Sequence, residues 1–186
     1  MFGILKSGGI IMIPIILCGI IATYIIIERC IYFYTTKKKD KILINNVLSL
    51  LNKGDFDACI RVCRESETPT SNVILKAIQS RDLEERDLRE IVETQMDLEV
   101  PTYEHLITTL GTIANISTLL GLLGTVTGNI KAFGVLGAGG TMGDPALLAG
   151  AIAEALVTTV AGLCVSIPSL IFNNFFISQV NHKIIE

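Results

Sequence analysis

Three long apolar stretches dominate the pattern of hydrophobic and polar positions along the chain. They cover residues 10–34, 106–136 and 146–176, and the second is interrupted by Lys131. A helix needs roughly 20 apolar residues to cross the hydrocarbon core of a bilayer, and each stretch reaches that length. The first stretch is longer than the core of a signal peptide and lacks a convincing small-x-small cleavage site. The pattern therefore predicts an all-α membrane protein with three transmembrane helices.

The chain between the first and second apolar stretches is polar and predicts a small helical domain. Its apolar residues recur at helical spacing, and residues 52–54 (Asn-Lys-Gly) form a helix-stop signal. Asp55 can cap the helix that follows, and residues 68–71 (Thr-Pro-Thr-Ser) can start another. The predicted helices of this domain cover residues 42–51, 55–64, 72–80 and 82–100. The mixed charges of the last helix are typical of a solvated face.

A cluster of lysines predicts how the chain is oriented in the membrane. The cluster follows the first apolar stretch directly, at Lys37, Lys38, Lys39 and Lys41. Because positive side chains stay on the cytoplasmic side, the N-terminus is expected outside and the C-terminus inside. The predicted parts are residues 1–35 (N-terminal segment and first span), 36–105 (cytoplasmic helical domain), 106–136 (second span), 137–145 (outside loop) and 146–186 (third span and cytoplasmic C-terminus).

The composition supports the membrane class and argues against several others. Of the 186 residues, 50% are hydrophobic and 18% are charged, and the mean hydropathy is +0.57, as in membrane proteins. The five cysteines are scattered without a nearby histidine set, so free thiols are expected and a zinc site is not. The glycine-rich residues 137–145 lack the lysine of a phosphate loop. No nucleophile–base pair is evident, and we expect no enzyme, cofactor, metal or nucleic-acid partner.

One carboxylate, that of Glu154, lies inside the third apolar stretch. It is the only Asp, Glu, Lys or Arg between Asp144 and Lys183. An ionisable side chain within a bilayer costs several kcal/mol unless it faces a protein interior or a wet cavity, which makes Glu154 a functional candidate. The alternative is a side chain that reaches the headgroups from near the interface. Small residues on both sides of Glu154 favour the buried site, because they suit close helix packing.

Small and polar residues follow helical periods in the second and third stretches. In the third, Glu154, Thr158, Gly162 and Ser166 recur every four residues and form one stripe. The second carries a polar face, which is either hydrogen-bonding glue between helices or the lining of a polar pathway. The members of this face are Thr108, Thr112, Asn115, Thr118, Thr125 and Asn129. Close helix contacts are expected at Gly121, Gly124, Gly128, Ala151, Ala155 and Gly162.

Two long motifs in the last part of the chain carry a resemblance to a known family. The first comprises residues 112–116 (Thr-Ile-Ala-Asn-Ile), 121–128 (Gly-Leu-Leu-Gly-Thr-Val-Thr-Gly) and 132–133 (Ala-Phe). The second comprises residues 152–163 (Ile-Ala-Glu-Ala-Leu-Val-Thr-Thr-Val-Ala-Gly-Leu) and 167–168 (Ile-Pro). They resemble the second and third helices of the ExbB/TolQ/MotA family, and are more similar to ExbB and TolQ, which carry the glutamate, than to MotA.

The resemblance implies a stator subunit in a bacterial inner membrane, with the outside being the periplasm. Proteins of this family form a pentamer around the helices of a small single-span ExbD/TolR-like partner. Ion flow down the proton-motive force then drives a periplasmic or outer-membrane machine, such as TonB-dependent uptake through a TonB-like protein. The alternatives are a Tol-type envelope-integrity motor subunit and a non-conducting membrane scaffold. A solute transporter is disfavoured, because many transporters have internal repeats and none is visible here.

The family's polar positions match Thr125, Glu154 and Thr159 in this sequence. Periodicity instead favours Thr158, whose side chain points about 100° away from that of Thr159, so both are candidates for a proton pathway, together with Asn115. The sequence departs from the family at three positions, each of which adds polarity: Thr118 replaces a common proline, Thr127 a tryptophan and Asn129 an apolar residue.

The environment of Glu154 decides between two chemical roles. Desolvation disfavours the charged form of a carboxylate, so a buried Glu154 could take up and release a proton. A permanent cation beside Glu154 would instead hold it charged, and would indicate a sodium site or a static ion pair.

Overall fold

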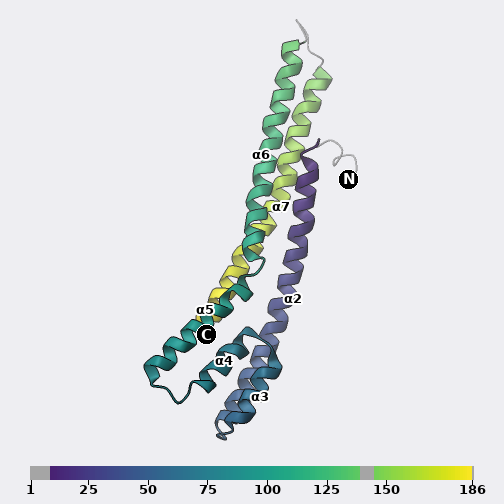
Figure 1. The fold of residues 1–186 in the computed structure, drawn as a ribbon. Helices are drawn as coiled ribbons and strands as arrows, with labels where there is room; N and C mark the ends of the chain where they lie inside the picture. Colours follow the sequence, from purple (N-terminus) through teal and green to yellow (C-terminus); the bar gives the residue numbers. More distant parts are fainter. Residues whose placement is uncertain (1–8, 139–144, 186) are drawn as a thin grey trace. The chain divides into compact units, whose positions relative to one another are not determined.

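The computed structural model describes residues 9–138 and 145–185, and every regular element in these residues is an α-helix (Figure 1). Three of the helices are long and apolar enough to cross a membrane. The predicted all-α membrane fold with three candidate spans is therefore confirmed. Most of the predicted outside loop, residues 139–144, lies beyond the described residues. The helices are α2 (Met12–Leu51), α3 (Phe56–Ser66), α4 (Pro69–Gln79), α5 (Glu85–Glu104), α6 (Ile107–Ala138) and α7 (Pro145–Ile185).

The chain divides into two compact units. We call the first the span unit, which consists of Met1–Ile27 and Leu106–Phe176. We call the second the polar unit, which consists of Glu28–His105 and Ile177–Glu186. The helices α2 and α7 each contribute residues to both units without a break.

The first span and the helix predicted over residues 42–51 form one element. Helix α2 runs for 40 residues from Met12 to Leu51, so the prediction of two separate helices was wrong. No glycine or proline lies between Tyr34 and Ile42, and the lysines in this segment are good helix formers. Nothing in the sequence therefore stops the helix where the apolar stretch ends.

Capping residues determine where the short helices of the polar unit begin. The predicted cap of α3 is confirmed, because Asp55 accepts a hydrogen bond of 3.0 Å from the backbone N–H of Ala58. Helix α4 begins at Pro69 rather than at residue 72. Thr68 and Ser71 form a reciprocal capping box with two backbone-to-side-chain bonds of 3.1 Å, and proline suits the first helical position that follows.

Helix α5 also differs from its predicted range of residues 82–100. It begins at Glu85 because residues 80–83 form a turn after α4, in which the N–H of Leu83 bonds the carbonyl of Ser80 at 3.1 Å. It continues through Pro101 to Glu104. Proline removes one helical hydrogen bond. Here the helix ends within four residues of Pro101, so few backbone hydrogen bonds of the helix are lost.

A small apolar core holds α2, α3 and α4 together in the polar unit. It consists of Leu43, Val47, Cys59, Cys63 and Ile78, which are all less than 9% exposed. All five cysteines of the chain are free thiols, as predicted from their number and spacing. Burial raises the pKa of both core thiols, so they hold little thiolate at neutral pH.

We therefore expect Cys59 and Cys63 to resist N-ethylmaleimide in the folded protein and to react when it is denatured. The reagent cannot reach a buried thiol, and a thiol with a raised pKa holds little of the thiolate that reacts. Mass spectrometry of the peptide that contains both residues measures the reaction. Arg61→Cys introduces an exposed thiol on the same helix and should react at once. Equal labelling of all three cysteines before denaturation would contradict the buried core.

Buried polar groups join α2, α5 and the end of α7 within the polar unit. Arg29 is 3% exposed, and its guanidinium lies 3.3 Å from the carbonyl oxygen of Tyr103 and 3.0 Å from Nδ1 of His105. Burial raises the pKa of Tyr103 to about 12, so its hydroxyl stays protonated. Asp40, which is 4% exposed, is paired with Lys183 of α7.

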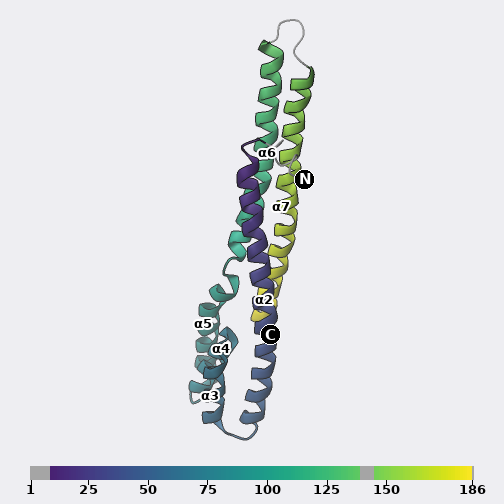
Figure 2. The same ribbon diagram turned by 90° about the vertical axis from the view of Figure 1, so that its right-hand side faces the viewer.

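The helices of the span unit approach closely at small residues, and many of its large apolar residues face outward. Helices α6 and α7 lie side by side (Figure 1 and Figure 2), and α2 approaches α7 at Gly19, where an added Cβ would lie 3.1 Å from Val165. The outward faces carry residues such as Ile130 and Phe133, which are 66% and 72% exposed. This pattern suits a lipid surface, because lipid is as apolar as leucine and helices associate in it through close packing of small residues.

Candidate functional site

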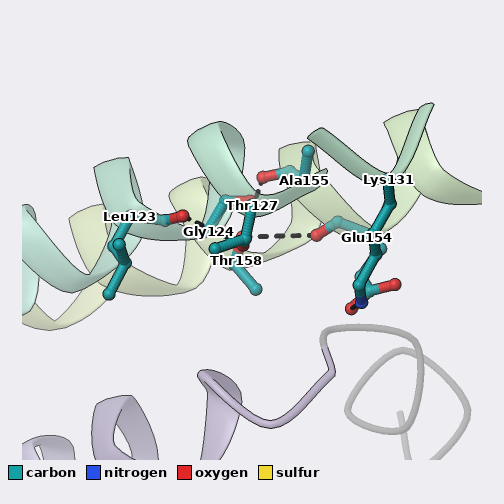
Figure 3. Close-up of polar contacts among 7 residues, drawn as sticks. All are labelled: Leu123, Gly124, Thr127, Lys131, Glu154, Ala155 and Thr158. Atoms are coloured by element: carbon teal, nitrogen blue, oxygen red, sulfur yellow. Dashed lines mark hydrogen bonds and ion pairs between the residues drawn. The ribbon is translucent and has the colours of Figure 1, made fainter. Parts of the chain in front are cut away.

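The side chain of Glu154 lies beside the only charged residue of α6. Lys131 Nζ is 2.6 Å from Glu154 Oε1, and Figure 3 shows the lysine reaching across from its own helix to the carboxylate. The Glu154 side chain is 27% exposed and that of Lys131 is 56% exposed. The Glu154 carboxylate also lies against Gly9, where an added Cβ would collide with Oε1.

Gly9 leaves no room for a side chain next to this carboxylate. Its φ is +62°, a conformation that glycine adopts readily and other residues rarely. The carboxylate is therefore covered by backbone on one side and by the lysine on another. Of the two environments considered for Glu154, the structure shows a cation beside the carboxylate, and this cation is a partly exposed side chain rather than an enclosed ion.

The two candidate threonines of α7 both turn toward α6. Thr158 is 1% exposed, and its hydroxyl donates to the carbonyl oxygens of Ala155 at 2.8 Å and Glu154 at 3.2 Å (Figure 3). The hydroxyl of Thr159 donates across the helix contact to the carbonyl of Gly121 at 2.9 Å. Both hydroxyls thus bond backbone carbonyls. They lie on the contact between α6 and α7, and Glu154 lies on the same contact, nearer to the start of α7.

The other two candidates, Thr125 and Asn115, make no hydrogen bond to α7 among the described residues. The hydroxyl of Thr125 donates to the carbonyl of Leu122 on its own helix at 2.7 Å, and Asn115 is exposed. Most of the polar face of α6 is likewise exposed in the single chain, at Thr108, Thr112, Asn115, Thr118 and Asn129. Among the described residues, only Thr118 of this group bonds α7, with its hydroxyl donating to Ser166 Oγ at 2.7 Å. Most of this face therefore does not join α6 to α7 within the chain.

The glycines of the two helices lie where the backbones approach most closely. A Cβ at Gly162 would lie 2.6 Å from the carbonyl oxygen of Ser117 and 3.0 Å from the Cα of Gly121. A Cβ at Gly128 would lie 3.0 Å from the carbonyl oxygen of Ala151, and one at Gly124 would collide with the side chain of Thr158. These contacts are within one chain, and the role of the glycines between subunits stays a prediction.

Sequence reasoning missed three buried polar residues of the span unit. Ser117 is fully buried and its hydroxyl has no hydrogen-bond partner among the described residues. Ser169 is 1% exposed and Asn173 is 9% exposed, with the Asn173 amide close to Gly111 of α6. Ser169 and Asn173 continue the stripe of Glu154 and Ser166 at helical spacing beyond Pro168. Following that period to the end of the stretch would have found them.

The fold and this contact define a class: an all-α membrane protein whose span unit carries a carboxylate and hydroxyl groups between two glycine-rich helices. Residues 65–186 match the model of the MotA/TolQ/ExbB proton channel family. This match covers more than half of the chain, and the chain belongs to that family. Members couple the proton-motive force to work as subunits of membrane motors, together with partner proteins.

Relatives over most of the chain carry ExbB names. A putative biopolymer transport protein, ExbB-like 3, from Synechocystis is 32% identical over 171 residues, which are 91% of this chain and 81% of the relative. The biopolymer transport protein ExbB of Neisseria meningitidis serogroup A is 27% identical over 194 aligned positions, 92% of this chain and 84% of the relative. The Tol-Pal system protein TolQ of Haemophilus influenzae is 36% identical over 86 residues, 46% of this chain and 37% of that protein.

Proposed function

We propose that this chain is the proton-conducting stator subunit of an ExbB-type complex, with Glu154 as the group that takes up and releases the proton. The observation that carries the proposal is the position of Glu154 on the contact between α6 and α7. It is the only charged residue between Asp144 and Lys183, and it lies on the same face of α7 as the buried Thr158, about one helical turn before it. A carboxylate held in a membrane span among polar groups is the usual component of a proton relay.

The exposed polar face of α6 supports assembly with other chains. Asn115 and Asn129 lie in a span that is apolar enough to cross a membrane, and polar side chains are costly against lipid. Other protein chains or water would have to cover this face in the membrane. A homopentamer around a small single-span ExbD/TolR-like partner would do so, and would bring Thr125 and Asn115 to a shared pathway.

The ExbB-type system is favoured over the Tol-type system by the comparisons. The ExbB-like protein of Synechocystis and the ExbB of Neisseria meningitidis align over nine-tenths of the chain, whereas the TolQ relative aligns over less than half. We therefore propose a bacterial inner-membrane protein that powers an uptake system of the TonB type, with its N-terminus in the periplasm and its C-terminus in the cytoplasm. Purifying the complex from native membranes and identifying the single-span protein bound to it tests this assignment.

Replacing Glu154 by glutamine is expected to abolish proton conduction without disturbing assembly. Glutamine keeps the size and hydrogen-bonding capacity of the side chain but cannot exchange a proton. The measurement is proton flux into vesicles that contain the purified complex, reported by a pH-sensitive dye trapped inside. The variant should fall to the rate of protein-free vesicles while its oligomer keeps the wild-type size in detergent.

Two comparisons make this experiment decisive. Glu93→Gln changes an exposed glutamate of α5 and should conduct like the wild type. Glu154→Asp keeps a carboxylate one carbon shorter and should retain part of the flux. If Glu154→Gln assembles and still conducts at the wild-type rate, the chain is a scaffold or conducts by another route, and the proposal fails.

A further inference from the structure

The membrane-crossing parts of α6 and α7 each contain one charged residue, and these two residues meet. Lys131 is the only Asp, Glu, Lys or Arg in residues 107–138, and Glu154 is the only one in residues 145–182. Their charged atoms are 2.6 Å apart. Either charge alone would be expensive in a bilayer, and the pair together carries no net charge.

We propose that Lys131 determines which ion Glu154 accepts: its ammonium occupies the position that a sodium ion would need, so that the proton is the only ion left to discharge the carboxylate. This inference rests on the proposed role of Glu154 in ion transfer. It identifies Lys131 as a specificity-determining residue of that transfer, which neither the family match nor the relatives' names assign.

The surroundings of Glu154 offer a sodium ion few ligands. In many secondary transporters, sodium ions are bound by backbone carbonyls that are freed where a helix is unwound. Helix α7 is continuous from Pro145 to Ile185, and the carbonyls of Glu154 and Ala155 already accept bonds from the Thr158 hydroxyl. With Gly9 against the carboxylate on another side, the Lys131 ammonium is the cation that this site accommodates.

A tethered ammonium is a strong competitor for a free cation. A group held on the same protein acts at an effective concentration in the millimolar range or above. A proton does not compete for that position, because it bonds covalently to a carboxylate oxygen. Proton transfer from a hydronium ion to Glu154 breaks one O–H bond of the hydronium and forms one on the carboxylate, which neutralises the carboxylate and breaks the ion pair.

The Lys131 ammonium can extend to the membrane interface when it is released from Glu154. Lys131 lies about two helical turns from the loop end of α6, and long basic side chains near the end of a span can extend to the interface. Its side chain is already 56% exposed. When Glu154 gives up its proton, the carboxylate attracts the ammonium back and the site closes again to other cations.

The test measures how fast dicyclohexylcarbodiimide labels Glu154 in the purified complex, by mass spectrometry of the peptide that contains it. This reagent adds to a protonated carboxyl group, so a cation that holds Glu154 charged slows the labelling. In the wild type, labelling should be slow, and exchanging choline for sodium should not change it. In Lys131→Met, labelling should be about twofold to fivefold faster, as expected for the loss of one partly exposed ion pair, and sodium should slow it again.

Lys131→Arg is the matched control, because it keeps the positive charge and should label slowly with no effect of sodium. Lys131→Gln serves as a second neutral variant if Lys131→Met fails to assemble. Equal labelling rates in the wild type and in the assembled neutral variant would overturn the proposal. So would protection by sodium in the wild type, or its absence in the neutral variant. These outcomes are independent of the flux assay on Glu154→Gln, which tests the role of Glu154 in conduction.

Discussion

Replacing Gly162 by alanine is expected to destabilise the span unit, although alanine is the better helix former. A Cβ at this position would lie 2.6 Å from the carbonyl oxygen of Ser117 and 3.0 Å from the Cα of Gly121. Both atoms belong to the backbone of α6, so a change of side-chain rotamer cannot make room. The two helices must separate, and we expect a loss of about 2 kcal/mol, which lies in the range for overpacked cores.

Gly150→Ala on the same helix provides the matched control. A Cβ at Gly150 meets nothing within 4 Å, so this change should gain the roughly 0.5–1 kcal/mol by which alanine exceeds glycine in a helix. The two variants differ by one methyl group at different positions of α7, and their melting temperatures should move in opposite directions. Circular dichroism of the detergent-solubilised protein during heating measures both. A Gly162→Ala variant that melts above the wild type would contradict the close contact of α6 and α7.

Removing the Lys183 ammonium is expected to have the largest effect in the polar unit. Asp40 is 4% exposed, and one of its carboxylate oxygens has no hydrogen-bond partner among the described residues. Lys183→Met would leave that carboxylate buried without a cation. Breaking a buried ion pair in this way typically costs ~3–5 kcal/mol. We expect the end of α7 to detach from α2, and amide hydrogen exchange over residues 177–185 to accelerate.

Two further variants distinguish the loss of the Asp40–Lys183 ion pair from the loss of a lysine in general. Lys37→Met removes an exposed lysine of α2 and should leave exchange over residues 177–185 unchanged. Adding Asp40→Asn to Lys183→Met removes the uncompensated charge and should restore part of the protection, because coupled residues give non-additive effects. Equal exchange rates in Lys183→Met and Lys37→Met would show that the buried pair does not hold the end of α7.

The fold could be predicted from sequence wherever a long-range pattern decides it. Three apolar stretches of sufficient length predicted the three long helices α2, α6 and α7. Helix ends were harder, because they depend on single side chains. Asp55 was identified as a cap, but the capping box of Thr68 and Ser71 places the start of α4 three residues earlier than predicted. The end of the apolar stretch near Tyr34 was mistaken for the end of a helix.

The candidate site was predicted in part. Glu154 stood out because a lone carboxylate in an apolar stretch is costly, and this argument needs no structure. Lys131 was noted only as an interruption, because its distance from Glu154 depends on how two helices are aligned. The polar face of α6 was found by its period, but periodicity cannot say whether a face is turned toward a helix of the same chain. The structure shows that α6 meets α7 at Ser117 and Gly121, and that Thr118 is the member of the polar face with a hydrogen bond to α7 among the described residues.

The pairing of Lys131 with Glu154 also bears on how the protein enters the membrane. Inserting either helix alone places an unpaired charge in the apolar region, at about 2.5–3.5 kcal/mol for a basic or acidic residue at the centre of a span and less toward its ends. The residues that connect α6 and α7 number only six between Ala138 and Pro145, so the two helices can meet as soon as both have been synthesised. Integration as a helical hairpin lets each charge neutralise the other during biogenesis, and an α6 segment translated without α7 should insert less efficiently.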